Sequence, residues 1–468
     1  MPTPPRNRRL GALLTESHWN AADLAKAVRG LGAAQGLALR YDRTAVAHWL
    51  TGTLPRHPVP ELVAAALSER IGRLVTVRDT GLTRSPQAPP LPESILTEDD
   101  PVRRLLNLCR TETDPERRAF LARTAFTLTS TALTPALPFP AGEAAATPPA
   151  PLPRPRRPGA PAVGACDVSA LEEMTQTFAA LSARHGGAHV RAMLAAYLDD
   201  QVGRLLNAPT ARPLRADLLA GAAQLTHLLA GMNDESGRPG LGQGYFRTAL
   251  DLARQADSPR LYAITLRAMS AQALRLGHPR HARDLAAGAV RVLPAHADPA
   301  TQSFLLVQHA HTLAVTGDRR RALADLAAAE RLHERAGDAD GPFRAYPRAG
   351  LDYQRAQTLL ALGDTPRALA ALESSVRHRT PAQRRTHALT RARLAQTLLG
   401  QGHVEAGTAH GHLFLDDCPH LHSVHIDTAL GQLAERLARF PRQPEAVRLL
   451  TRVTEFTGGG RRSRSATG

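Results

Sequence analysis

The sequence has few cysteines and almost no lysine. Its three cysteines in 468 residues, Cys109, Cys166 and Cys418, lie far apart in the chain. An odd number of scattered cysteines excludes a disulfide framework and favours a reducing, cytoplasmic environment. Lys26 is the only lysine, so the formal net charge of +16 comes from arginine. Such a charge indicates an acidic partner such as nucleic acid, although arginine is also abundant in any protein of a GC-rich genome.

Long apolar runs are missing as well. No run reaches the ~18 residues that a membrane helix needs, and the basic N-terminus lacks the apolar region of a signal peptide. We therefore expect a cytoplasmic protein that does not enter a membrane. The stretch "ERRAFLARTAFTLTSTAL" at 116–133 resembles a twin-arginine export signal. Because it begins more than a hundred residues into the chain, we interpret it as an amphipathic helix.

Aromatic residues make up only 4% of the chain, so small aliphatic side chains must fill the core. Alanine, leucine, arginine and glutamate favour helices, and the predicted fold class is all-α. Composition predicts four segments: a small helical head at 1–85, a Pro/Ala-rich linker at 86–165 with a short helical island at 101–132, a helical body at 166–457 and a disordered basic tail at 458–468.

The head contains the stretch "RTAVAHWLTGTLPR" at 43–56. Val46, Trp49 and Leu50 recur at helical spacing and predict a buried face, and Gly52 predicts the end of the helix. The preceding helix has its own apolar face, formed by Leu24, Ala25 and Val28. A supporting helix followed by a helix with a polar outer face is the layout of a helix-turn-helix, whose second helix enters the major groove.

The polar face of this second helix supplies the candidate DNA contacts. Arginine can bind guanine through two hydrogen bonds, short side chains allow close approach to bases, and flanking arginines suit phosphates. The predicted contact residues are Arg40, Arg43, Thr44, Ala47, His48 and Arg56. The alternative is a helical hairpin that binds only proteins. Net charge helps little here, because residues 1–80 hold 11 basic and 6 acidic residues.

The body repeats a glycine that is followed five residues later by alanine. The copies are Gly244–Ala249, Gly277–Ala282, Gly317–Ala322 and Gly363–Ala368, with Gly402–Gly407 as a weaker copy. Glycine ends one helix and alanine lets the next helix approach closely, so the pattern predicts helix pairs that stack into a solenoid similar to tetratricopeptide repeats. The alternative is a generic helical bundle.

Stacked pairs form a concave surface, which is usually the binding face of a solenoid. Polar residues on the first helix of each pair would line it, and the candidates are Gln302, His309, Gln354 and Gln357. Ordinary solvated positions are the alternative for these residues. We expect a peptide, small-molecule or protein partner here, and a homodimer that brings two heads onto neighbouring half-sites.

Other patterns favour neither catalysis nor a cofactor. The segment 410–425 is rich in histidine and aspartate but lacks a paired Cys-x-x-Cys, so no metal is predicted. The glycines of "GRPGLGQGYF" follow no strand, which argues against a dinucleotide loop. No hydrolase, metalloprotease or nucleotide-binding signature is present. We therefore expect a protein that is not an enzyme.

Two resemblances sharpen the prediction. "TAVAHWLTGTLP" looks like the recognition-helix end of Cro/repressor-type domains, although "RGLGAAQGLALRY" is longer than their usual turn. The head, together with "LRAMSAQALRLGH" and the repeats, resembles actinobacterial helix-turn-helix/tetratricopeptide regulators, among them NsdA-type negative regulators of streptomycete sporulation and antibiotic production. The resemblance implies a DNA-binding transcriptional regulator. The alternative is a repeat scaffold whose head does not read DNA.

Overall fold

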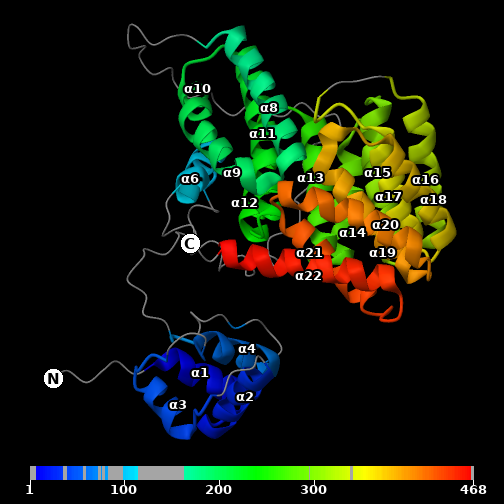
Figure 1. Ribbon diagram of the computed structural model, residues 1–468. Coiled ribbons are helices and arrows are strands. Elements are labelled where there is room, and N and C mark those ends of the chain that lie inside the picture. Colours follow the sequence, from blue (N-terminus) through cyan, green and yellow to red (C-terminus); the bar gives the residue numbers. More distant parts are fainter. Residues whose placement is uncertain are drawn as a thin grey trace. The chain divides into compact units, whose positions relative to one another are not determined.

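The computed structural model describes residues 7–34, 39–55, 59–71, 75, 80–82, 98–113, 163–294, 296–337 and 341–464. Within these residues every regular element is helical, which confirms the predicted all-α class (Figure 1). No described helix has the length and apolar character required to cross a membrane. The chain divides into two compact units, Met1–Pro92 and Glu93–Gly468, which are described separately below.

The head consists of α1 (Arg8–Ser17), α2 (Ala21–Ala34), α3 (Arg43–Leu50) and α4 (Val59–Ile71). One apolar core joins them, and the predicted core residues belong to it: Leu24, Ala25, Val28, Val46 and Trp49 are buried, while Leu50 is partly buried. The long interval between the two central helices has two causes. Helix α2 has 14 residues, and residues 35–42 then connect it to α3.

The body is a series of antiparallel helix pairs in which each pair packs on the next one. The pairs are α11 (Arg212–Glu235) with α12 (Pro239–Gln255), α13 (Pro259–Arg275) with α14 (Pro279–Val292), α15 (Pro299–Val315) with α16 (Arg319–Glu334), α17 (Arg348–Ala361) with α18 (Thr365–His378), α19 (Arg384–Gly400) with α20 (Val404–Asp417), and α21 (Val424–Leu437) with α22 (Pro444–Arg464). This arrangement confirms the tetratricopeptide-like solenoid.

Four elements lead into these pairs. α8 (Ala165–His185) and α9 (Gly187–Tyr197) pack on α11, and the π-helical turn η1 (Leu198–Val202) and α10 (Gly203–Asn207) continue α9. Short 3-10 turns, η2 (Pro381–Gln383) and η3 (Cys418–His420), lie between later helices.

The three free cysteines include two that are buried, Cys109 and Cys418.

The turn inside each of the first five pairs contains a left-handed glycine. Gly277, Gly317, Gly363 and Gly402 have φ between 79° and 91°, as the repeat pattern predicted. The prediction for Gly244 was wrong, because this residue lies inside α12 and the turn glycine of that pair is Gly237, with φ of 73°. The corrected glycines are spaced 40, 40, 46 and 39 residues apart.

The corrected register also explains the small residue five positions after each glycine. Ala282, Ala322 and Ala368 are fully buried at this position. The first and fifth pairs have Gly242 and Gly407 there instead. A Cβ atom at Gly242 would lie 2.9 Å from the carbonyl oxygen of Ala230, and one at Gly407 would lie 2.8 Å from Leu399 Cγ. Only a very small residue therefore permits the observed approach of the two helices.

The structure differs from the prediction in the segment between head and body. Helix α6 (Pro101–Thr113) belongs to the second compact unit and packs on α9 and α12. Its apolar residues Leu105 and Cys109 are buried, and its Glu112 forms a buried ion pair with Arg191. The apolar face and the buried ion pair of this helix require a surface to pack on. The proline-rich sequence around the helix gave no indication of that surface. The rest of the predicted island, the twin-arginine-like stretch included, lies outside the described residues.

The basic tail also differs from the prediction. Helix α22 continues through Gly458 to Arg464 instead of ending near Thr457. Its first half is anchored by the buried residues Ala446, Leu449 and Val453. Once a helix is anchored, each further residue adds a hydrogen bond at little cost, so even a glycine-rich end can extend it.

Candidate functional site

Helix α3 begins at a capped position that fixes the direction of its first turn. The Asp42 carboxylate accepts hydrogen bonds of 3.0 Å from the backbone N–H groups of Thr44 and Ala45. These bonds lower the pKa of Asp42 and keep it ionised. At the other end, Gly52 adopts φ of 102° and the backbone N–H of Asn7 donates to the carbonyl oxygen of Leu50. The helix is therefore held at both ends as well as through its buried face.

The opposite face of α3 is open to solvent. Arg43, Thr44, Ala47 and His48 are all exposed, as is Arg40 in the preceding segment. Asp42, the acidic residue next to this face, is committed to the helix cap. Arg56, the sixth predicted DNA contact, lies outside the described residues. The structure thus brings five of the predicted contacts to one region of the head and places the predicted core residues behind them.

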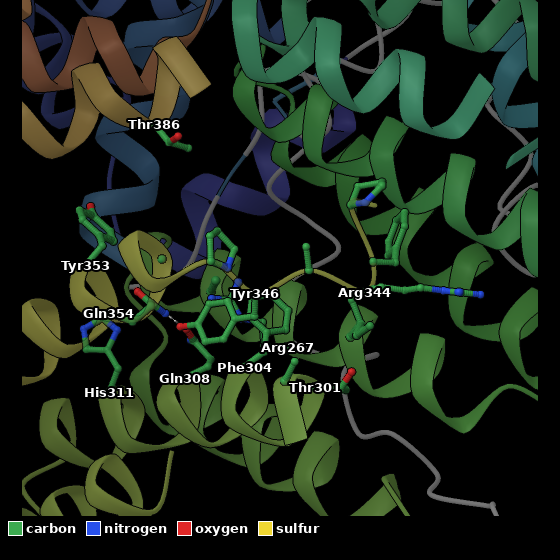
Figure 2. A pocket seen from close by; sticks show the side chains of 18 of the residues that line it. Arg267, Thr301, Phe304, Gln308, His311, Arg344, Tyr346, Tyr353, Gln354 and Thr386 are labelled. Atoms are coloured by element: carbon green, nitrogen blue, oxygen red, sulfur yellow. Dashed lines mark hydrogen bonds between the residues drawn. The ribbon is translucent and has the colours of Figure 1, made fainter. Parts of the chain in front are cut away.

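The body has a cavity of about 520 Å³ on the side formed by the first helices of its pairs (Figure 2). His227 of α11, Arg267 of α13, Phe304 of α15, Tyr353 of α17 and Thr386 of α19 all contribute to its wall. The volume falls in the ~300–1,000 Å³ range of small-ligand sites. Because the helices come from successive pairs, the cavity depends on the stacking of the solenoid.

One loop enters this cavity from between two pairs. Residues 335–347 connect α16 to α17, and this insertion accounts for the longer interval of 46 residues between Gly317 and Gly363. Tyr346 lies edge-on to Phe304, with ring centroids 5.0 Å apart, and Phe343 lies edge-on to His227 at 5.2 Å. Figure 2 shows Tyr346 and Arg344 along this loop. The loop therefore provides an aromatic wall to a cavity otherwise built from helices.

Two of the four predicted groove residues line the cavity. The side-chain amide of Gln354 donates to Gln308 Oε1 at 2.8 Å, and that of Gln357 donates to Tyr353 Oη at 3.0 Å. Gln302 and His309 lie elsewhere. Gln302 donates to the carbonyl oxygen of Ala297 at 2.7 Å. His309 Nδ1 is 2.7 Å from Asp325 Oδ2 on the paired helix α16, so it faces the interior of its own hairpin.

The cavity wall is basic. Among the described residues, its lining includes four arginines, Arg267, Arg275, Arg344 and Arg379, and no aspartate or glutamate. Arg275 is paired with Asp234. The Arg267 guanidinium instead lies over the ring of Phe304, 4.0 Å from its centroid. Burial lowers the pKa of Arg267 to about 10, and the nearby Tyr346 offsets only part of this effect.

Sequence reasoning missed Arg267, Phe304 and Tyr346. Arg267 stands directly after the buried Leu266 and two residues before the buried Met269, on a first helix. An arginine among closely spaced buried positions was a usable signal, because such a cation must meet an aromatic ring or an anion. The signal for Tyr346 was the long interval between the third and fourth glycines, which marks an inserted loop.

Two histidines of the cavity are held neutral. Burial lowers the pKa of His227 to about 4, and the nearby Arg267 lowers it further. His311 is also lowered to about 4, chiefly by burial and then by Arg393 and Arg267. His227 Nδ1 lies 3.0 Å from Thr265 Oγ1. The neutral rings leave the arginines as the cationic groups of the wall at neutral pH.

The two ends of the solenoid meet near the cavity. The backbone N–H of His422, between α20 and α21, donates to the carbonyl oxygen of His185 at 2.9 Å. Glu235 accepts from the Gly187 N–H at 2.8 Å and forms an ion pair with Arg385 of α19. In an open solenoid each repeat contacts only its neighbours. Here the closing contacts join α8, α9 and α11 to α19 and α21 and hold the cavity wall together.

The histidine-rich segment takes part in protein contacts. His412 Nδ1 lies 2.7 Å from an Arg452 nitrogen, and Asp416 pairs with the same arginine at 2.9 Å. Asp417 pairs with Arg391 at 3.3 Å. Over the described part of the chain, no group of three or more histidine, cysteine, aspartate or glutamate residues is placed to hold a metal ion.

Comparison with known proteins gives one family match and two similar solved structures. Residues 10–83 match the SP15 N-terminal domain family. Among solved structures, the chain is similar to a Rap protein complexed with competence and sporulation factor, at 10% identity over 63% of this chain and 86% of that chain, with a TM-score of 0.41. It is also similar to the APC/C hetero-tetramer Cut9–Hcn1, at 13% identity over 94% of this chain and 68% of that chain, with a TM-score of 0.31.

No curated protein matches the chain significantly. The assignment of the body therefore rests on its own helix pairs, turn glycines and small-residue positions. These features show a helical repeat protein of the tetratricopeptide type, and residues 10–83, ahead of the repeats, are similar to the SP15 N-terminal domain family.

Proposed function

We propose that the chain is a DNA-binding transcriptional regulator whose repeat body binds an effector. The observation that carries the first half is the surface of α3. Arg43, Thr44, Ala47 and His48 are exposed on one side of a helix whose other side is anchored by Val46 and Trp49. Side chains of these types can read base edges in the major groove, and the exposed Arg40 beside them suits a phosphate.

The second half of the proposal depends on the cavity. The cavity lies on the first helices of the pairs, has the size of a small-ligand site and is lined by aromatic residues and arginines. An effector held there would change DNA binding only if it bound the DNA-bound and DNA-free forms with different affinity. Development and secondary metabolism are the processes that the sequence resemblance suggests for its targets, and dimerisation of the body is its suggested route to paired half-sites.

The second candidate function is a protein-interaction scaffold with a head that does not read DNA. The closed, tetratricopeptide-type body favours it, since such repeats are surfaces for binding. The two candidates differ in whether the head reads DNA, so the discriminating experiment measures DNA selection.

The test is in vitro selection of duplex DNA from a random pool by the full chain. Wild-type protein is expected to enrich a short shared motif. Arg43→Ala should relax the preference at one position of the motif, because a bidentate arginine–guanine contact is worth ~1–3 kcal/mol of discrimination. Arg320→Ala, an exposed arginine on the outer helix α16, is the matched control and should select the wild-type motif. A pool that stays random with wild-type protein would favour the scaffold.

A further inference from the structure

We propose that the cavity of the body binds an organic anion, namely a carboxylate carried on an apolar or aromatic group. This inference specifies the effector of the proposed regulator, and it rests on that proposal only for its consequence on DNA binding. The binding itself is a property of the cavity wall.

The first argument is an uncompensated cation. Arg267 is largely enclosed by the protein, and its Nε has no hydrogen-bond partner. Among the described residues no carboxylate pairs with its guanidinium, which contacts the Phe304 ring instead. A buried charge without a counter-charge is costly, and proteins retain one chiefly where a ligand supplies the missing charge. An anion that enters the cavity would therefore supply the missing counter-charge.

A second arginine of the wall is held by neutral groups only. Arg379 Nε donates to Thr390 Oγ1 at 3.1 Å, and one of its terminal nitrogens donates to the carbonyl oxygen of Ala349 at 3.4 Å. These contacts orient the guanidinium without cancelling its charge. Arg379 also lies 6.0 Å from the ring centroid of Tyr353, another residue of the wall.

The hydroxyl of Tyr346, like the Nε atom of Arg267, lacks a hydrogen-bond partner among the described residues. This hydroxyl is buried. Burial raises the pKa of Tyr346, so the hydroxyl keeps its proton and can donate it to an acceptor. Arg267 and Tyr346 lie close together in Figure 2. Together they give one side of the cavity wall a positive charge and an unpaired hydroxyl, which suit the negative charge and the acceptor oxygens of a carboxylate.

The rest of the wall determines what must accompany the carboxylate. Ile264, Leu274, Phe304 and Tyr353 give the cavity an apolar and aromatic lining. A small hydrophilic anion such as inorganic phosphate would leave this surface in water, whereas an apolar or aromatic body would cover it. The volume of about 520 Å³ limits the ligand to a small molecule or to the last residues of a peptide.

Two sources share this chemistry: a free organic acid and the C-terminal carboxylate of a peptide. The experiment is ligand-detected NMR on the full chain with two probe sets. One set contains aromatic and aliphatic carboxylic acids, each paired with its primary amide. The other contains N-acetylated tripeptides ending in leucine or phenylalanine, each with a free or an amidated C-terminus.

The carboxylates are expected to bind at least tenfold more tightly than their amides. Arg267→Met should abolish this preference, and Arg320→Met, on the outer surface, should preserve it. Preference within the acid set identifies a free organic acid as the source, and preference within the tripeptide set identifies a peptide terminus. Equal binding of acids and amides, no binding by either set, or an unchanged preference in Arg267→Met would overturn the proposal.

The stability of the unliganded chain gives a readout that does not depend on the choice of probe. If Arg267 is kept for a ligand, Arg267→Met should raise the melting temperature of the free protein by about 2–4 °C, because it removes an unpaired buried charge and puts an apolar side chain against the ring of Phe304. A lower melting temperature would assign Arg267 a structural role and contradict the proposal. Neither result affects DNA selection by α3, so failure here is distinguishable from failure of the proposed regulator.

Discussion

At the scale of single residues, Trp49 connects the core of the head to its candidate DNA-binding face. Its side chain is 3% exposed, and its ring lies 5.4 Å from that of Tyr41. Its neighbour in sequence, His48, is exposed on the opposite side of α3. We therefore expect Trp49 to contribute to the stability of the head and the adjacent His48 to contribute to DNA recognition.

We predict that Trp49→Ala lowers the free energy of unfolding of the head by ~3–5 kcal/mol, since it removes the largest side chain of a small core. His48→Ala, one residue away on the exposed face, should leave stability within ~0.5 kcal/mol. The measurement is denaturant unfolding of the full chain followed by tryptophan and backbone signals. If the unfolding transition of the head were unchanged in Trp49→Ala, the assignment of Trp49 to the core would be incorrect.

His227 provides a prediction about pH. Its pKa in the folded protein is about 4, and the ordinary value is 6.5, so between these values the unfolded chain binds more protons. Stability contributed by the neutral ring is therefore present above pH 6.5 and is lost as the pH falls towards 4. A shift of this size corresponds to at most ~3 kcal/mol.

In His227→Asn the loss of stability between pH 6.5 and pH 4 should be smaller than in wild type. His420→Asn, at an exposed position, is the control and should follow the wild-type profile. The measurement is a set of denaturant unfolding curves across this pH range. Parallel curves for wild type and His227→Asn would mean that His227 does not titrate in this window.

At the scale of helices, the small residue after each turn glycine sets the distance between paired helices. Gly242→Ala should destabilise the body by about 1–3 kcal/mol, because the added methyl group would meet the backbone of Ala230 and Asp234. Gly231→Ala, inside α11 of the same pair, has open space around the new methyl group and should stabilise the chain by roughly 0.5–1 kcal/mol. Thermal unfolding of both variants checks the prediction, and effects of equal sign would refute the packing argument.

Periodicity predicted the helix pairs because the turn glycine and the small residue act locally. It misplaced the first pair because "SGRPGLGQGYF" offers Gly237, Gly240, Gly242 and Gly244 within a few residues, and only tertiary contact distinguishes a turn from a close approach. The same limit applies to the cavity. Gln354 and Gln357 were found because they lie on a first helix, whereas Gln302 and His309 share that property but point elsewhere.

Long-range contacts were beyond sequence reasoning altogether. The position of Tyr346 depends on a loop that folds back across earlier pairs, and the docking of α6 depends on partners more than seventy residues away, such as Arg191 for Glu112. No local pattern specifies which distant residue completes a buried ion pair. The core and the exposed face of the head were easier to predict, because the spacing of apolar residues in one short helix indicates both.

At the scale of the whole molecule, the contact between Glu235 and Arg385 should hold the two ends of the solenoid together. Glu235→Gln removes the charge that pairs with Arg385 and keeps an acceptor for the Gly187 N–H. The pair is partly exposed, so we expect a loss below the ~3–5 kcal/mol of a fully buried pair. Hydrogen exchange should become faster at residues 185–189 and 422–425, and Glu435→Gln, an exposed control on α21, should not change it. Unchanged exchange in Glu235→Gln would show that this pair does not hold the ends together.

The central claim is that α3 gives the whole chain its sequence-specific contact with DNA. Chromatin immunoprecipitation with sequencing of wild-type and Arg43→Ala chains tests it in the cell. The account predicts sharp peaks that share one motif for wild type, and weaker peaks with a relaxed motif for Arg43→Ala at equal protein level. Recovery of wild-type protein at background level, or identical peaks for both chains, would contradict it.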